Sequence, residues 1–152
     1  MTEITIKETA ALTPAELLTI MAARVRVFVV EQNCPYQEVD DKDYQAVHVM
    51  LRENGALVAY GRLVPHDDGK AISFGRVLVV RSARGRGLAR ELVATLLSEL
   101  ATRYPSRPVK IQAQAYLQAF YGLFGFRAVS DVYLEDGIPH VDMVLDKTAA
   151  AR

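Results

Sequence analysis

A glycine-rich turn between an apolar run and a long amphipathic helix most constrains the fold of this chain. The run Val77-Leu78-Val79-Val80 is continuous enough for a strand buried on both faces, and we expect it to be central in a sheet. After the turn, leucines recur at threes and fours and predict a helix. Its buried face is formed by Leu88, Leu92, Leu96, Leu97 and Leu100. A strand, a glycine turn and a helix in this order indicate a fold that contains both element types.

The remaining elements extend this unit into a mixed α+β fold, in the broad α/β class, around one sheet. Thr13 and Pro14 predict a helix start, and the apolar period continues to about Val30. A third helix is expected at about 117–124. Strands are predicted at 2–7, 47–52, 56–64, 71–80, 109–114, 128–133 and 140–145. We expect one domain over residues 1–147 and a frayed tail over 148–152.

Composition excludes several classes of protein. The 152 residues are 51% hydrophobic and 24% charged, which suits a single core. The net charge is zero, so no overall attraction to nucleic acid or to an anionic membrane is expected. Cys34 is the one cysteine, which argues against a disulfide or a zinc site and favours a reducing cytoplasm. We therefore expect a cytoplasmic protein without a bound metal and without a membrane or nucleic-acid partner.

The turn itself has the features of an anion site. Free N–H groups at a helix start favour negative charge, and glycines allow a ligand close to the main chain. Four arginines surround the turn: Arg81, Arg84, Arg86 and Arg90. The sequence lacks the lysine-serine/threonine ending of a mononucleotide loop and the three-glycine spacing of a dinucleotide site. A phosphate-bearing ligand is expected, and the alternative is a turn that only reverses the chain beside solvated arginines.

A family resemblance narrows the ligand. The stretch Arg84-Gly85-Arg86-Gly87-Leu88-Ala89 resembles the pyrophosphate-binding pattern of the GNAT acetyltransferases, which is Gln/Arg, two free positions, Gly, one free position, Gly/Ala. The resemblance implies acetyl-coenzyme A as donor and a strand at 77–80 that splays from the strand at 109–114. The implied cofactor-binding residues are Leu78, Val79, Val80, Arg84, Gly85, Arg86, Gly87, Leu88, Ala89 and Gln114.

Two further stretches carry the resemblance. Residues 114–126 are similar to the GNAT helix with an aromatic-tyrosine pair followed by glycine and phenylalanine. This implies that Tyr121 protonates the departing thiolate, with simple packing as the alternative, and that Gln114 stands where many relatives have an asparagine that binds pantetheine. Residues 26–40, with Asp43, His48 and residues 137–140, are similar to the ElaA-like branch of the family.

The acceptor is less constrained than the donor. Transfer to an amine requires a base, and Glu31, His48 and His140 are the candidates, with deprotonation in solvent as the alternative. An acidic segment follows the first predicted helix and contains Glu31, Glu38, Asp40, Asp41 and Asp43. It either attracts a cationic amine or is a solvated loop.

Arg24 and Arg26 could instead bind a carboxylate on the acceptor. The acceptor is thus a primary amine of a small molecule or peptide, and a homodimer is compatible with the resemblance. The alternative function is a non-catalytic acyl-coenzyme A sensor that docks a protein partner.

Overall fold

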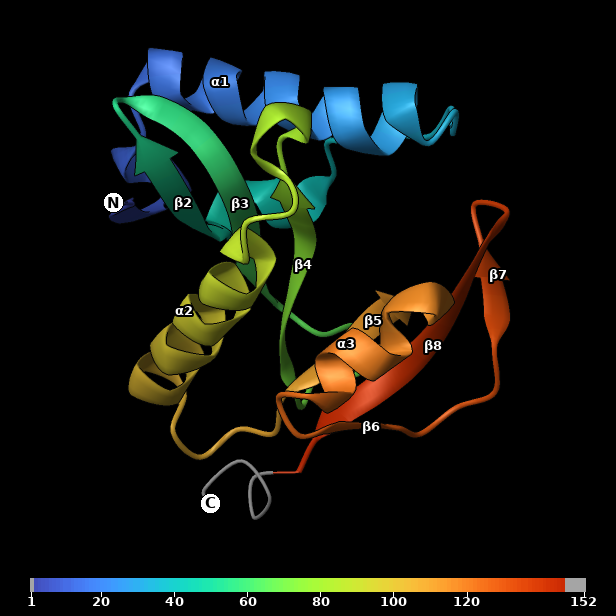
Figure 1. The fold of residues 1–152 in the computed structure, drawn as a ribbon. Coiled ribbons are helices and arrows are strands. Elements are labelled where there is room, and N and C mark those ends of the chain that lie inside the picture. The colour runs from blue at the N-terminus through green and yellow to red at the C-terminus, as the bar shows by residue number, and fades with distance from the viewer. Residues whose placement is uncertain (1, 147–152) are drawn as a thin grey trace. The chain divides into compact units, whose positions relative to one another are not determined.

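The computed structural model describes residues 2–146, and the predicted tail at 148–152 lies outside them. The mixed α+β fold predicted from the sequence is confirmed, but its strands form two four-stranded sheets rather than the one sheet expected (Figure 1). Its strands are β1 Glu3–Glu8, β2 Val47–Glu53, β3 Ala56–Pro65, β4 Ile72–Val79, β5 Lys110–Gln114, β6 Phe126–Ala128, β7 Tyr133–Glu135 and β8 Ile138–Leu145. Its helices are η1 Thr9–Ala11, α1 Pro14–Arg24, η2 Val25–Glu31, η3 Asp41–Gln45, η4 Arg81–Ala83, α2 Leu88–Arg103, η5 Ala115–Leu117 and α3 Gln118–Gly122.

The described residues form two compact units, the first of residues 2–64 and 74–103 and the second of residues 65–73 and 104–146. The first sheet has the order β1-β2-β3-β4, in which β1–β2 and β2–β3 are antiparallel. β4 is the last strand in that order rather than an inner one. Accordingly only Leu78 is buried in its apolar end, while Val77 and Val79 are half-buried. The prediction of a central strand buried on both faces was therefore wrong, because the apolar run has only one buried side chain between Val77 and Val79.

The first helix begins as the sequence predicts but changes its winding. The Thr13 hydroxyl accepts a hydrogen bond from the Glu16 N–H at 3.1 Å, and the Glu16 carboxylate accepts one from the Thr13 N–H at 2.8 Å. This capping box satisfies N–H groups at the helix start. α1 ends at Arg24, and η2 continues the chain as a π-helix. The prediction of one α-helix to Val30 was thus wrong in winding, in a stretch where β-branched valines disfavour α-helix.

α2 packs closely on the first sheet at a glycine. A Cβ on Gly61 of β3 would lie 2.9 Å from Leu96 Cδ1, so a larger residue would force the Leu96 side chain to shift. Four of the five predicted leucines are buried, but Leu97 is half-buried and Val93 is buried instead. The predicted buried face was therefore rotated slightly from the observed one.

The second unit contains the order β5-β8-β6, with β7 also paired to β8. These pairs are antiparallel, whereas Ile72 and Val109 form a parallel bridge. The predicted strand at 128–133 is divided into β6 and β7. Between them the Ser130 hydroxyl accepts from the Asp142 N–H at 2.9 Å, so a side chain replaces a ladder contact there.

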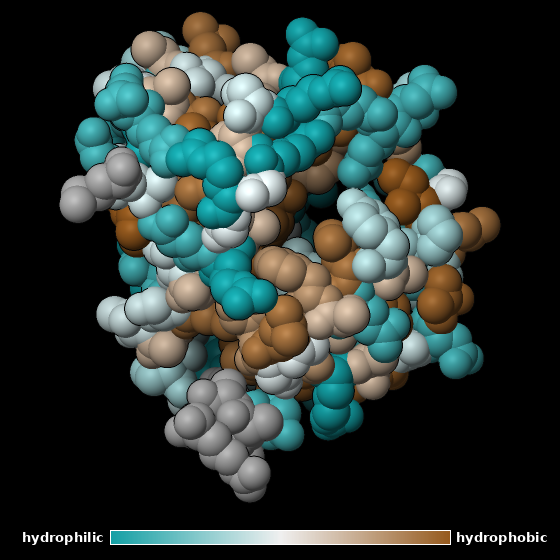
Figure 2. All heavy atoms as spheres, in the orientation of Figure 1, coloured by the Kyte–Doolittle hydropathy of each residue, from teal (hydrophilic) through white to brown (hydrophobic). Residues whose placement is uncertain are grey.

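The molecular surface shows no single dominant character on the face drawn in Figure 2, where hydrophilic and hydrophobic residues are intermixed. Within residues 2–146, no helix is both long enough and apolar enough to cross a membrane.

Candidate functional site

The glycine turn of the first unit has the geometry of an anion site. Gly85 and Gly87 have φ values of +80° and +78°, which residues with a side chain rarely adopt. A Cβ at either position would meet no atom within 4 Å, so space beside the main chain is open. The Gly87 carbonyl accepts the first helical hydrogen bond, from the Glu91 N–H at 3.2 Å. The amides at the start of α2 therefore lack partners within the helix and suit a phosphate.

Both arginines within the turn are held by carboxylates of the same unit. Arg84 Nη2 lies 2.6 Å from Glu31 Oε1, and Arg84 Nε donates to the Val79 carbonyl at 2.9 Å. Arg86 Nη2 lies 2.5 Å from Glu53 Oε2. The structure thus brings together Arg84 and Glu31, which the sequence assigned to different roles. A carboxylate that accepts from an arginine is better placed to orient that arginine than to accept a proton.

The strand before the turn has its key side chain, Leu78, in the core of the first unit. Leu78 is buried against Ile20, Met50 and Tyr60. Val80 packs against the same cluster, and its N–H donates to the Val58 carbonyl at 3.0 Å. Packing therefore fixes the position of the backbone that the resemblance assigns to pantetheine.

His48 is enclosed in the first unit, with both ring nitrogens in use. Nε2 lies 2.8 Å from Thr9 Oγ1, and Nδ1 lies 2.7 Å from the Tyr60 hydroxyl. Thr9 gives its own proton to the Asp43 carbonyl at 2.5 Å, so it accepts from His48 Nε2–H. Tyr60 then donates to Nδ1. Burial lowers the pKa of His48 to about 4, and the side chain is 0% exposed. These contacts favour a structural role over the predicted role as base.

The enclosed neutral imidazole makes stability depend on pH. The unfolded chain protonates His48 near pH 6.5, whereas the folded chain does so only near pH 4, so folded stability is complete above pH 6.5 and falls between these values. The variant His48→Gln keeps hydrogen-bonding groups but does not titrate. From pH 7 to pH 5, we expect its free energy of unfolding to fall by about 2 kcal/mol less than that of wild type. Urea denaturation at both values measures this. Equal losses in the two proteins would contradict it.

His140 of the second unit differs from His48, because its hydrogen bond is made by one ring nitrogen, Nδ1. Its Nδ1 lies 2.7 Å from the Ile138 carbonyl, which only accepts, so the proton of the neutral ring is on Nδ1. Nε2 then carries the lone pair, as a base requires. The ring stacks on Tyr133 at 6.2 Å between centroids, and the Tyr133 hydroxyl donates to Asp142 Oδ1 at 2.6 Å. His140 also pairs with Gln114 across β5 and β8, so these two predicted site residues are neighbours.

Tyr121 is buried in the second unit, with 5% of its surface exposed. Its ring makes edge contacts with Phe120 and Phe126. Burial raises the pKa of the Tyr121 phenol well above its ordinary value, so the hydroxyl keeps its proton at neutral pH. The phenol therefore has a proton to donate, but the raised pKa makes it a weaker acid, and the aromatic contacts fit the packing alternative.

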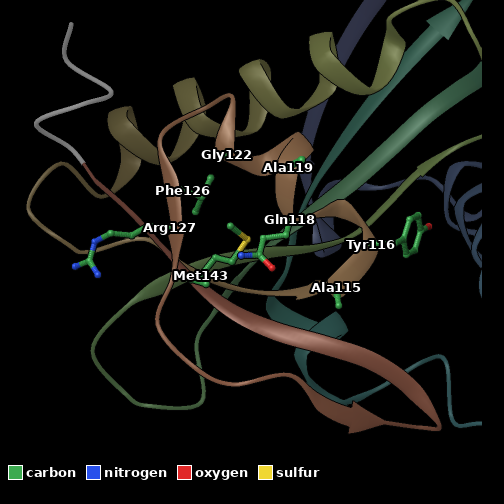
Figure 3. Close-up of a pocket in the computed structure, with 9 residues that line it drawn as sticks. Ala115, Tyr116, Gln118, Ala119, Gly122, Phe126, Arg127 and Met143 are labelled. Carbon is green, nitrogen blue, oxygen red and sulfur yellow. The ribbon is translucent and has the colours of Figure 1, made fainter.

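A pocket of about 620 Å³ opens beside α3 in the second unit (Figure 3). It is lined by Ala115, Tyr116, Gln118, Ala119, Gly122, Phe126, Arg127, Ala128 and Met143. Tyr121 is not among these residues. The sequence did not predict this pocket, because η5, α3, β6 and Met143 of β8 line it together only in the folded chain.

The acidic segment is built into the first unit through Arg24, whose side chain is 0% exposed. Arg24 donates to Asp43 Oδ1 at 2.6 Å and Oδ2 at 3.0 Å, and its Nε donates to Glu38 Oε2 at 2.5 Å. Burial alone would raise the pKa of Asp43, but the hydrogen bond from Arg24 helps to lower it to about 2. Asp43 therefore stays ionised at neutral pH.

Two further arginines complete this buried network. Arg62 contacts Asp40 at 2.7 Å and Asp43 at 2.8 Å, and Arg76 contacts Glu38 at 2.9 Å. Three guanidinium groups thus balance three carboxylates. We call this set, which consists of Arg24, Arg62, Arg76, Glu38, Asp40 and Asp43, the ion network.

The ion network corrects two expectations about the acceptor. Arg24 is enclosed and fully engaged, so it does not offer a site for an acceptor carboxylate. Glu38 and Asp43 are buried and neutralised, so they form neither a solvated loop nor a free attractant for a cation. Charge runs in the sequence do not reveal partners that lie far away along the chain.

Metal ligands are not grouped in the part of the chain that the structure describes. Over residues 2–146, no three His, Cys, Asp or Glu side chains are placed to hold a metal ion.

Known proteins resemble this chain over most of its length. The family described as acetyltransferase (GNAT) domain matches residues 10–147. Protein ElaA of Escherichia coli is 42% identical over 135 residues, which cover 87% of this chain and 88% of ElaA. The crystal structure of E. coli ElaA matches with a TM-score of 0.90 at 38% identity, covering 96% of this chain and 100% of that one.

Two other solved structures are also similar. An acyl-CoA N-acyltransferase from Pseudomonas aeruginosa matches with a TM-score of 0.90 at 43% identity, covering 95% of this chain and 99% of that one. A GNAT family acetyltransferase from Elizabethkingia anophelis, solved with acetyl-CoA bound, shares the fold with a TM-score of 0.59 at 17% identity, covering 93% of this chain and 94% of that one.

Proposed function

This chain belongs to the GNAT family of acyltransferases, and from that premise we propose that it moves an acetyl group from acetyl-coenzyme A to a primary amine of a small molecule or peptide. The observation that carries the proposal is the turn with two positive-φ glycines, open space beside them and, at the start of α2, amides that have no partner within the helix. The acetyl-CoA bound to the E. anophelis protein supports the choice of donor. We also propose a cytoplasmic location, in keeping with a chain that has one cysteine, Cys34.

The donor is proposed to bind along β4 and the turn. Amides of residues 84–89 hold the pyrophosphate, while Arg84 and Arg86 add positive charge. The main chain of residues 78–80 and the Gln114 side chain bind the pantetheine arm. Glu31 acts through Arg84, whose guanidinium it orients from the end of η2. A small acyl group, acetyl, is the proposed cargo.

His140 is proposed as the base. Its Nε2 lone pair takes a proton from the acceptor ammonium, which leaves a neutral amine able to attack the thioester carbonyl. The Ile138 carbonyl fixes the tautomer that this step needs. Among the three candidates, His48 has both nitrogens in use and Glu31 accepts from Arg84, so His140 alone combines a fixed tautomer with an available lone pair.

Tyr121 is proposed as the acid. Attack by the amine nitrogen forms a C–N bond and a tetrahedral oxyanion, which the Leu78 amide stabilises by a hydrogen bond. Collapse of that intermediate breaks the C–S bond. The thiolate of coenzyme A then takes the phenol proton, which Tyr121 recovers from solvent. The nitrogen releases its remaining extra proton to solvent, and so does the protonated His140, which restores the base.

The acceptor is proposed to be recognised by groups other than the ion network. That network carries no net charge and is mostly buried, so it adds little attraction for a polycation. A small amine or a peptide amine that reaches His140 fits this arrangement better than a molecule recognised through free carboxylates of the acidic segment.

Calorimetry and an amine screen test the function. We expect micromolar binding of acetyl-CoA, and release of free coenzyme A thiol with at least one amine among amino acids, polyamines, aminoglycosides and peptides. Absence of acetyl-CoA binding would contradict the proposed function. Tight binding without thiol release across the whole screen would instead support a non-catalytic sensor.

Variants of the acid and the base separate catalysis from binding. We expect Tyr121→Phe and His140→Gln each to lower kcat by about 100-fold while the Kd for acetyl-CoA stays within about twofold of wild type, because each residue moves a proton. Tyr44→Phe, at an exposed tyrosine, is the matched control and should behave as wild type. Unchanged kcat in either test variant would remove that residue from the mechanism.

A further inference from the structure

β4 contains a backbone conformation that its sequence does not favour. Arg76 has φ of +52°, in the left-handed region that residues with a Cβ adopt at a cost. Glycine would adopt this φ freely, yet the neighbouring glycine, Gly75, lies one position earlier and is not in that region. A left-handed residue within a strand bends it and re-aims the following peptide groups, as in a β-bulge. Such strain persists only where surrounding contacts hold it.

The contacts that hold Arg76 come mainly from Glu38 of the acidic segment, and Asp40 Oδ2 also lies 3.5 Å from Arg76 Nη2. Arg76 Nε donates to Glu38 Oε2 at 2.9 Å, and Arg76 Nη2 donates to the Glu38 carbonyl at 3.0 Å. The guanidinium also lies over the Tyr36 ring, 5.5 Å from its centroid, and the Tyr36 hydroxyl donates to Glu38 Oε1. Glu38 is 4% exposed, so these charge-assisted contacts are shielded from water.

Glu38 is in turn fixed from the other side. Arg24 Nε donates to the same Oε2 at 2.5 Å, and Arg24 Nη2 donates to the same carbonyl at 3.0 Å. Two arginines, Arg24 at the end of α1 and Arg76 in β4, therefore donate to the same two oxygens of Glu38. Because Arg24 also binds these oxygens, Glu38 has little freedom to move with β4 if the strand relaxes.

We infer that Glu38 and Arg76 form a clamp that keeps β4 bent so that the Leu78 main chain, two residues further on, faces the acetyl thioester; this rests on the proposed function. Glu38 is then a positioning residue for the donor. The side chain at position 76 is required because the clamp needs a bidentate guanidinium, which outweighs the backbone preference for glycine. The clamp acts on the acyl end of the donor, while the glycine turn acts on its nucleotide end.

The two ends of the donor give a direct test. The probes are acetyl-CoA and adenosine 3′-phosphate 5′-diphosphate, which carries only the nucleotide end. We expect Arg76→Gly, which accepts φ of +52° without strain, to weaken acetyl-CoA binding about tenfold and to leave binding of the nucleotide probe within about twofold of wild type. Asn54→Gly is the control, because Asn54 has φ of +51° in a hairpin turn away from the clamp.

Hydrogen exchange gives a second readout that needs no ligand. Amides of residues 77–79 in the free protein should exchange at least about tenfold faster in Arg76→Gly than in wild type, and those of α2 should not change. Equal loss of affinity for both probes would indicate a general structural effect and would overturn the inference. So would unchanged exchange at 77–79. If wild type binds neither probe, the proposed function fails, while the exchange result still decides whether the clamp holds β4.

Discussion

Gly87→Glu is expected to abolish acetyl-CoA binding at concentrations up to about 100 times the wild-type Kd. Two effects act together at this position. Glutamate has a Cβ and is strained at φ of +78°, and its carboxylate would lie beside the amides that are proposed to hold the pyrophosphate. Like charges brought together at a binding site cost several kcal/mol. Isothermal titration calorimetry with acetyl-CoA measures the loss.

The control for this variant is Gly69→Glu. Gly69 has φ of +74° and open space around a built Cβ, so the same replacement introduces the same strain and charge in a different turn. Its acetyl-CoA affinity should match wild type. Equal binding by wild type and Gly87→Glu would show that the turn does not hold the pyrophosphate, and the proposed donor would then have no support from its main structural feature.

Local features of the site were predictable from the sequence because they depend on neighbouring residues. The two positive-φ glycines, the helix that follows them and the capping box at Thr13 each arise within a few residues. The hairpin at Asn54-Gly55 has the same origin, since φ is positive at both residues. A single sequence contains the information for such elements.

The ion network was not predictable, because its partners are distant in the chain. Arg76 and Glu38 are separated by 38 residues, and Arg62 and Asp43 by 19. From sequence alone, a run of carboxylates in a loop is predicted to be solvent-exposed. Only the folded structure shows the arginines that neutralise these carboxylates and allow them to be buried. The π-helix η2 was not predicted for another reason. Over so short a stretch, hydrophobic spacing near 3.6 residues does not distinguish a π-helix from an α-helix.

The roles of the histidines also depend on tertiary contacts. His48 and His140 both stand in apolar strands, and their sequence neighbours do not separate them. Thr9 and Tyr60 occupy both nitrogens of the first, whereas a carbonyl two residues away fixes the tautomer of the second. Only the tertiary contacts of His48 decide which histidine has a lone pair to offer.

Arg24→Met is expected to lower the free energy of unfolding by about 3–5 kcal/mol, the largest stability effect predicted for this chain. Methionine fills much of the space of the arginine stem but leaves Glu38 and Asp43 without the cation that faces them in the interior. Their remaining partners, Arg76 and Arg62, compensate in part. Urea denaturation at pH 7 measures the change.

Arg26→Met is the matched control, because Arg26 lies two residues further along and is exposed. It should change stability by less than about 0.5 kcal/mol. Adding Glu38→Gln to Arg24→Met removes one of the stranded charges, so the double variant should be more stable than the sum of the two single losses implies. Additive losses, or equal midpoints for Arg24→Met and Arg26→Met, would mean that Arg24 does not stabilise the buried carboxylates, and the clamp on β4 would then have no fixed support on the α1 side.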